Sequence, residues 1–294
     1  TDTGTLPRAR PGPGQRFDDV SALKQVVKSG RALFDRALPP PAGVTILIYH
    51  RIGGGSSSDV DLRVSDFEAQ LAHLAANHEV ISLDEAVDRL NPDPDDPAGT
   101  PDDRRSSVVI TIDDGTADLT EHALPALERA GLPSTVYLAT RFIDEQVDFP
   151  WGAPPASWPA LRDAASPLVT YASHTHGHWL LDRTSSQEVA DDLDRSIDLI
   201  ASHLDVHPVH FAYPKAIPPD PSSEVAVRRR FRSAALAGNR VNRAGNADLH
   251  RLARTPIQRS DGFDNFVAKA CGGARLEGAL RAAVSRARLR GATR

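Results

Sequence analysis

The sequence contains one cysteine and no methionine, and it lacks both long apolar runs and long basic runs. Cys271 has no second cysteine with which to form an internal disulfide or a cysteine-based zinc site. The cysteine content therefore does not distinguish an oxidising from a reducing compartment. No apolar run approaches the roughly 20 residues of a membrane-spanning helix, and we expect no membrane span. The net charge of −5 and the lack of a basic run argue against a nucleic-acid partner.

The composition that remains is that of a folded domain. The 294 residues are 40% hydrophobic and 25% charged, which is close to the average of globular domains and enough to bury a sizeable core. We expect residues 1–43 to be an N-terminal tail with room for a helix, and residues 44–294 to form a single domain. The first residues lack the basic-then-apolar design of a secretory signal, so the cytoplasm is the default location. A removed leader would instead imply the cell envelope or secretion, and the oligomeric state stays open.

Strand-like and helix-like segments alternate along the chain. Short apolar runs predict strands, and apolar residues at helical spacing predict helices. Ser65 with Glu68 and Ser185 with Glu188 have the spacing of capping boxes that open two of the helices. This alternation predicts βα units and a mostly parallel sheet, and seven or eight such units fit a closed barrel. The predicted strands are 44–49, 79–83, 107–112, 134–139, 168–173, 209–213, 233–237 and 255–257; the predicted helices are 65–76, 84–90, a segment ending near 130, 185–204, 261–270 and 275–289.

Three polar clusters follow directly on predicted strands. They are Thr111–Gly115 (TIDDG), Ser173–His178 (SHTHGH) and Phe211–Lys215 (FAYPK). Because the carboxyl ends of parallel barrel strands meet at one mouth, we expect these clusters to face a common site. Each has a plainer interpretation, since Asp-Asp-Gly alone is a common turn.

Two pairs of histidines have the spacing His-x3-His. His203 and His207 are predicted at a helix end before a proline, where histidines suit the helix dipole, so we interpret that pair as structural or solvated. His174 and His178 follow a strand and share the chain with Asp113 and Asp114, which follow another. Two imidazoles and one carboxylate, with positions left open for water, are a common catalytic metal site.

The three clusters in this order resemble the polysaccharide deacetylase family (carbohydrate esterase family 4, NodB homology domain). The segments ILIYHRI, SDFEAQLAHLA and EVISLDEAV are also similar to the N-terminal part of bacterial members, so the resemblance spans most of residues 44–270. It implies a distorted (β/α)7 barrel that uses one divalent metal ion, with zinc expected. The implied reaction removes N-acetyl groups from an acetylated glycan, which would be the partner.

The resemblance also assigns roles to individual residues. Asp113 would be the general base, and Asp114, His174 and His178 would be the metal ligands. Pro214 and the backbone N–H of Lys215 would fall where the family forms its oxyanion hole. These roles suit the chemistry, because an amide carbonyl is a poor electrophile that needs a polarising cation, an activated water and a donor for the oxyanion.

The chain departs from the family pattern in two places. The third motif contains Ala212-Tyr213-Pro214-Lys215, as in the branch with FAYP, where many members have an arginine that orients the base. We expect Arg254, next to the predicted strand 255–257, to replace it; the alternative is an exposed arginine in an Arg-rich segment. Lys215 is the rival residue, but a metal ion would repel its amine, so we expect its side chain to point away from the site. A late Leu-x-His motif, which would supply a general acid, is missing. His250 is either that acid or a surface residue.

Other candidates concern the substrate. His50 ends the first predicted strand and either lines the site or is a buried, hydrogen-bonded core residue. Tyr213, Pro214 and Trp179 are candidate substrate contacts, although a core or loop-packing role is the alternative for any single tryptophan, including Trp151 and Trp158. Competing functions on the same scaffold are an O-acetyl esterase, a small-amide hydrolase and a non-catalytic glycan-binding descendant.

Overall fold

The computed structural model describes residues 42–92 and 106–272. The expected tail up to residue 41, most of the expected loop 91–105 and the expected helix 275–289 lie outside these ranges. None of the described helices is both long enough and apolar enough to cross a membrane.

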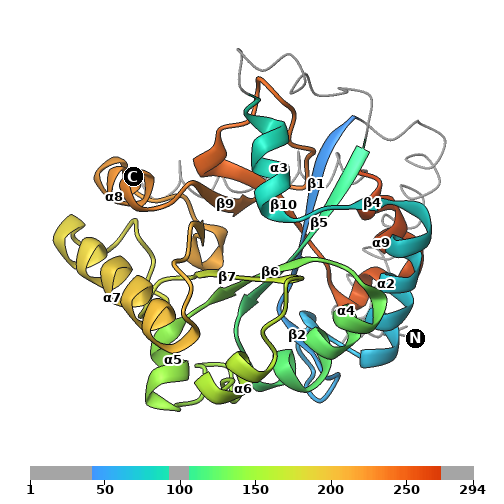
Figure 1. Cartoon of the computed structure of the whole chain (residues 1–294), viewed down its shortest axis with the longest axis horizontal. Coiled ribbons are helices and arrows are strands. Elements are labelled where there is room, and N and C mark those ends of the chain that lie inside the picture. The colour runs from blue at the N-terminus through green and yellow to red at the C-terminus, as the bar shows by residue number, and fades with distance from the viewer. Residues whose placement is uncertain (1–41, 93–105, 273–294) are drawn as a thin grey trace, which may run out of the picture.

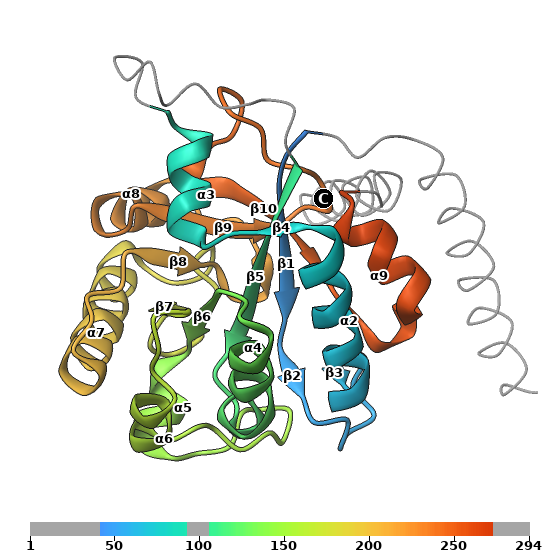
Figure 2. The same cartoon turned by 45° about the vertical axis from the view of Figure 1, so that its right-hand side comes forward.

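Seven parallel strands form a closed barrel (Figures 1 and 2). The hydrogen-bonded order runs β1-β10-β9-β8-β7-β6-β5, and β1 pairs with both β10 and β5, which closes the ring. Strand β4 adds to the outer edge of β5, and β2 and β3 form a separate two-stranded sheet. The strands are β1 Gly43–Tyr49, β2 Arg51–Ile52, β3 Asp61–Leu62, β4 Glu79–Val80, β5 Ser106–Asp114, β6 Ser134–Leu138, β7 Val169–Ser173, β8 His210–Ala212, β9 Ser233–Ala237 and β10 Leu252–Pro256.

Strand β5 shows how the sequence determines the interior of the barrel. Its residues from Ser107 to Asp114 are all buried, as expected of a strand covered on both faces. Because side chains alternate along a strand, Val109, Thr111 and Asp113 point to one side. Val109 packs in a cluster with residues of β1, β6 and β10, which identifies that side as the barrel interior. The same alternation therefore carries Asp113 to the top of the interior.

Helices cover the outside of the ring. α2 packs against α4 and α9 on one side, and α7 packs against α5, α6 and α8 on the other (Figure 2). α3 contributes Leu83, Ala86, Val87 and Leu90 to the cluster that fills the barrel below the site. The helices are α2 Val64–Asn77, α3 Leu83–Leu90, a π-helical turn Leu119–Ala123, α4 Leu124–Ala130, α5 Thr140–Glu145, α6 Trp158–Asp163, α7 Ser186–Leu204, α8 Pro221–Arg230 and α9 Gly262–Ala270, with short 3-10 turns at Pro214–Ala216, Leu249–Arg251 and Arg259–Asp261.

The observed elements correct several expectations in detail. α2 begins at Val64, and its N-cap, Arg63, makes no side-chain hydrogen bond, so the predicted capping box at Ser65 is wrong. The chain enters α2 straight from β3, which places Ser65 inside the helix. β4 ends at Val80, because Ser82 instead caps α3 by accepting a hydrogen bond from Glu85 N. The capping box of Ser185 and Glu188 at the start of α7 is present.

Candidate active site

The ends of β5 and β7 bring three potential metal ligands together. Asp114 is the last residue of β5, and His174 follows directly on β7. His178 lies four residues further along the same loop. Asp114, Thr175 and His178 have positive φ angles of 77°, 70° and 55°, so tight turns at both strand ends direct these side chains inward.

The three side chains face one another at short distances. Asp114 Oδ1 lies 3.7 Å from His174 Nε2 and 3.5 Å from His178 Nε2. One ligand atom from each residue lies within 4.8 Å of the other two, and residues 42–92 and 106–272 contain no other such group of three. His174 Nδ1 donates to Ala212 O over 2.7 Å, which leaves Nε2 with a free lone pair.

The protonation of this cluster suits a cation. Burial lowers the pKa of His174 to about 4, and burial together with His174 lowers the pKa of His178 to about 3. Both imidazoles are therefore neutral near pH 7. Burial and the charge of Asp113 raise the pKa of Asp114 to about 8, since the cluster offers this carboxyl no positive charge. Two nitrogen lone pairs and a buried carboxyl thus converge, and with the carboxyl deprotonated they are the donor set of a divalent metal site.

A buried aspartate on α7 holds the histidine loop in place. Asp192 accepts hydrogen bonds from His176 N over 2.8 Å and from Gly177 N over 2.7 Å. Thr175 Oγ1 accepts from His178 N over 2.8 Å. The sequence analysis did not identify Asp192. The sequence feature that could have identified Asp192 is its position next to Leu193, on the apolar face of a predicted helix. A carboxylate buried there without a partner would be costly, so a hydrogen-bonding role is expected.

Asp113 forms a bidentate ion pair with Arg254. Arg254 Nη1 donates to Asp113 Oδ1 over 2.6 Å, and Nη2 donates to Oδ2 over 2.8 Å. Arg254 is fully buried, its Nη1 also donates to Thr111 Oγ1, and its guanidinium lies 5.0 Å from the ring centroid of Tyr137. Burial alone would raise the pKa of Asp113, but the Arg254 charge and hydrogen bonds outweigh it and lower the pKa to about 2. The structure thus places Arg254 where the sequence analysis expected it.

A cavity of about 330 Å³ opens above these residues. Its lining includes the three potential metal ligands, Asp114, His174 and His178, together with Asp113. His50, Lys215 and Trp151 also line it. His50 Nδ1 is buried without a hydrogen-bond partner among the described residues. Trp151 is half exposed, and its ring stacks on Phe149 and meets the edge of His178. The tryptophan at the cavity is therefore Trp151.

Four other candidate residues do not line this cavity. Tyr213 is buried and its ring packs against Phe211 in the core, and Pro214 beside it is buried as well. Trp179 is 44% exposed outside the cavity. His250 lies before the first residue of β10, at the opposite end of that strand from the site, and its Nε2 hydrogen bonds with Phe231 O. Its position does not support the expected role as general acid.

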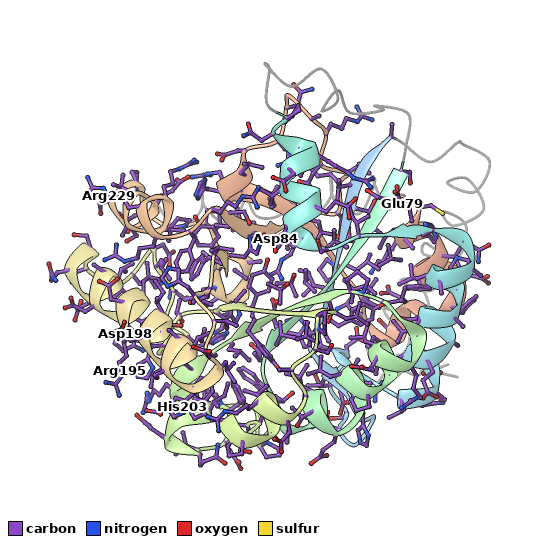
Figure 3. The ribbon with its side chains drawn as sticks, viewed as in Figure 1. Glu79, Asp84, Arg195, Asp198, His203 and Arg229 are labelled. Atoms are coloured by element: carbon purple, nitrogen blue, oxygen red, sulfur yellow. The ribbon has the colours of Figure 1, made fainter. Side chains whose placement is uncertain are left out.

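The second histidine pair lies on the surface. The His203 ring stacks on Trp158, at 4.6 Å between centroids, near the end of α7, and Figure 3 shows it at the edge of the molecule. His207 is exposed, and neither histidine belongs to the ligand group. This agrees with the structural or solvated interpretation of the pair.

Comparisons with known proteins give one consistent result. The family model described as "Polysaccharide deacetylase" matches residues 100–232. The protein named "Putative polysaccharide deacetylase YxkH" of Bacillus subtilis strain 168 is 23% identical over 230 residues, which cover 77% of each chain. The structure of IcaB from Ammonifex degensii superposes with a TM-score of 0.67 at 23% identity, over 79% of this chain and 97% of that one. The Streptococcus pyogenes deacetylase PplD, solved in complex with acetate, gives 0.66 at 20% identity, over 78% and 99%. The two structures share the fold of this chain.

Proposed function

We propose that the chain is a metal-dependent hydrolase of the polysaccharide deacetylase family, whose model matches residues 100–232, and that it removes N-acetyl groups from an acetylated glycan. The observation that carries the proposal is the convergence, in one cavity, of the ligand cluster Asp114, His174 and His178 with the buried pair Asp113–Arg254. A non-catalytic descendant has no need to keep both. The same groups would serve an O-acetyl ester or a small amide, so the bond cleaved is part of the proposal.

Asp114, His174 and His178 would hold the cation, for which we propose zinc. When bound, a divalent cation supplies Lewis acidity, which polarises a carbonyl and makes a nearby water acidic enough for a weak base. The hydrogen bond from His174 Nδ1 to Ala212 O fixes the tautomer and the ring orientation that this requires.

Asp113 is the proposed general base. Its carboxylate lies next to the ligand Asp114 in sequence, yet both of its oxygens are engaged by Arg254, so it is not free to rotate toward the cluster. Arg254 keeps the carboxylate ionised and oriented, and the remaining lone pairs of its oxygens can accept a proton from an attacking water. Arg254 is therefore a positioning residue that acts through Asp113.

The proposed donor for the oxyanion is the backbone N–H of Lys215, in the turn after β8. Lys215 and Ala216 both line the cavity, and both have left-handed backbone angles, with φ of 53° and 52°. Pro214 fixes the start of this turn. A backbone donor held by such a turn needs no rearrangement when negative charge develops.

The test is acetate release by the full chain, stripped of metal and reconstituted with zinc, from N-acetylglucosamine oligomers, O-acetylated xylan and cyclic amides. We expect the N-acetylated oligomers to be the best substrates and release to depend on added metal. Release from O-acetylated xylan alone would identify an esterase, and release from no substrate under any metal would refute the proposed function.

A matched pair of double variants tests the ligands. His174→Ala with His178→Ala should abolish both metal binding and acetate release, whereas His203→Ala with His207→Ala, which has the same spacing at the surface, should change neither. Metal content is measured by elemental analysis after dialysis. One equivalent of metal retained by the first variant would contradict the assigned site.

A further inference from the structure

Lys215 brings an uncompensated positive charge to the cavity. Its side chain is exposed and lines the cavity with Asp113 and Asp114. Within residues 42–92 and 106–272 its amine has neither an ion pair nor a hydrogen bond. This contrasts with most arginines of the described chain, which engage carboxylates or carbonyls.

The other charges around the cavity are already matched. Arg51 donates to Asp118 over 3.0 Å and lies 3.8 Å from Asp61. Asp113 is neutralised by Arg254, and Asp114 belongs to the ligand cluster. No further carboxylate of the described chain lines the cavity. Among the charged side chains that line the cavity, Lys215 is therefore the cation without a carboxylate partner in the described chain, and a bound divalent cation would add positive charge beside it.

The backbone conformation of the turn determines the position of Lys215. Lys215 has φ 53° and ψ 15°, and Ala216 follows with φ 52°, so two consecutive residues adopt the left-handed region that few residues other than glycine occupy. The turn begins at Pro214, which is buried. Lys215, Ala216 and the ligand cluster line the same cavity, so the turn presents the lysine on the side of the proposed metal site.

We propose that the Lys215 amine binds an anionic group, a carboxylate or a phosphate, that is carried by the acetylated sugar close to its scissile acetyl group. This inference rests on the proposed function and narrows its substrate class to acidic glycans. An ammonium on a four-carbon stem is suited to such a group, because it can reach a charge at variable distance without demanding planar, bidentate geometry. The interaction would lie at the rim of the site, so it is sensitive to salt.

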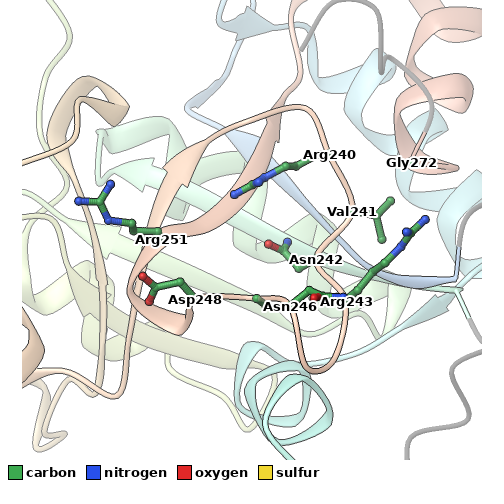
Figure 4. Close-up of a pocket in the computed structure, with 9 residues that line it drawn as sticks. Arg240, Val241, Asn242, Arg243, Asn246, Asp248, Arg251 and Gly272 are labelled. Atoms are coloured by element: carbon green, nitrogen blue, oxygen red, sulfur yellow. The ribbon is translucent and has the colours of Figure 1, made fainter. Parts of the chain in front are cut away.

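A second cavity, at the opposite end of the barrel, supplies a matched control. Figure 4 shows it lined by Arg240, Arg243 and Arg251, with Asp248 beside them. Arg251 is engaged by Glu224, whereas Arg240 is exposed and, in the part of the chain described, has no partner. Arg240 does not line the active-site cavity and belongs to none of the three polar clusters that follow strands. Arg240→Gln therefore removes the same amount of charge from the protein as Lys215→Gln without touching the site.

The experiment compares three substrates of similar length. They are a neutral N-acetylglucosamine tetramer, a tetrasaccharide in which N-acetylglucosamine alternates with glucuronate, and an N-acetylglucosamine tetramer phosphorylated at O6. For each we would measure kcat/KM with the zinc-loaded wild type, Lys215→Gln, Lys215→Arg and Arg240→Gln. We expect Lys215→Gln to lower the ratio of acidic to neutral kcat/KM about tenfold, mainly through KM, and Lys215→Arg to restore most of it. Arg240→Gln should leave the ratio unchanged, and the effect should shrink at high salt.

A binding measurement separates this inference from the proposed function. Zinc-loaded Asp113→Asn protein, with and without Lys215→Gln, is titrated calorimetrically with the same oligosaccharides. If no acetate is released from any of them by the wild type, the proposed function fails, while a Kd ratio that depends on Lys215 still supports the inference. An acidic-to-neutral ratio that Lys215→Gln leaves unchanged, in turnover or in binding, overturns it. The acidic substrate that shows the larger effect, glucuronate-containing or phosphorylated, identifies whether Lys215 prefers a carboxylate or a phosphate.

Discussion

Five residues around the cavity hold backbone angles that residues other than glycine seldom adopt. Asp114, Thr175, His178, Lys215 and Ala216 have φ between 52° and 77°. A strained conformation of this kind costs on the order of 1 kcal/mol or more and persists only where neighbouring contacts enforce it. Their concentration at one mouth of the barrel shows that the surrounding structure stabilises unfavourable turns in order to direct these side chains.

Among single residues, the substitution Asp113→Asn tests whether Asp113 is the general base, as proposed. Asparagine preserves the size of the side chain but cannot accept a proton as a carboxylate does, so we expect acetate release to fall by about two orders of magnitude or more. Metal content should stay at one equivalent, because Asp113 is not among the three ligands. Turnover near that of the wild type would show that another group activates the water.

The role of Arg254 is tested by two substitutions. Arg254→Lys keeps the charge but loses the bidentate contact with Asp113, so we expect kcat to fall about tenfold with KM and metal content unchanged. Arg254→Ala should lower kcat at least as much. It should also lower the free energy of unfolding by about 3 kcal/mol, because it leaves a buried carboxylate without its partner. A full rate in Arg254→Lys would reduce the arginine to a structural residue.

Among the elements, the strands that carry motifs were the easiest to predict from the sequence. β5 contains a run of β-branched residues, Val108–Ile112, and the alternation of its side chains places Thr111 and Asp113 on one face. α7 was predicted from a capping box and a regular apolar stripe. α8 was missed because its buried residues are Ser223, Glu224 and Val227, so it is held largely by polar contacts and has no apolar periodicity to detect.

A carboxylate on α8 makes a pH-dependent contribution to stability. Glu224 accepts a hydrogen bond from Arg251 over 2.5 Å, which ties α8 to the segment before β10, and another from Arg228 of the same helix over 2.7 Å. The hydrogen bonds from Arg251, opposed by burial and supported by Arg228, lower the pKa of Glu224 to about 2. A carboxyl whose pKa is lower in the folded state stabilises the fold above its ordinary pKa and loses that contribution as the pH falls toward 2.

We therefore expect Glu224→Gln to lower the free energy of unfolding by about 2 kcal/mol at pH 7. The difference from the wild type should shrink between about pH 4.5 and pH 2. Urea unfolding at a series of pH values measures it. Glu145→Gln, which breaks only the exposed pair with Arg141, is the matched control and should change stability by less than about 0.5 kcal/mol at any pH. A difference for Glu224→Gln that is constant down to pH 3 would contradict the assignment.

For the molecule as a whole, the part of the site that depends on closure of the barrel was the hardest to predict. Asp114, His174 and His178 were identified because each follows a strand within a recognisable motif. The partnership of Arg254 with Asp113 was predicted only as one of two alternatives, because it joins residues far apart in the sequence that the pairing of β1 with both β5 and β10 brings together. The roles of His250 and Trp179 stayed open between the site and the surface, because one sequence does not show which end of a strand, or which loop, faces the cavity.

The side chain of Asn242 makes hydrogen bonds through which the closure of the barrel between β1 and β10 can be tested. It is buried, its Nδ2 donates to Ala253 O over 2.8 Å and to Val44 O over 3.2 Å, and its Oδ1 accepts from Ala253 N over 2.8 Å. It thus joins β10 to β1. We expect Asn242→Ala to lower the free energy of unfolding by about 3 kcal/mol, since the buried N–H and C=O of Ala253 lose their side-chain partner, although the backbone of residue 242 still pairs with Val44. Chemical denaturation measures this, and Asn246→Ala, an exposed residue of the same loop, should have almost no effect.

The closed ring also sets the order in which the protein can become active during synthesis. β1 lies near the beginning of the described chain and β10 near its end, so the last seam forms only after residues up to Pro256 have left the ribosome. Until then β1 has only β5 beside it, and the opposite edge of the nascent barrel is unpaired, which is an aggregation hazard for a slow-folding, non-local topology. Arg254, which we propose to orient the base, arrives with that final strand. A ribosome-bound chain stalled before residue 252 would therefore present the three proposed metal ligands but no arginine beside Asp113, so we expect metal capture to precede catalytic competence during translation.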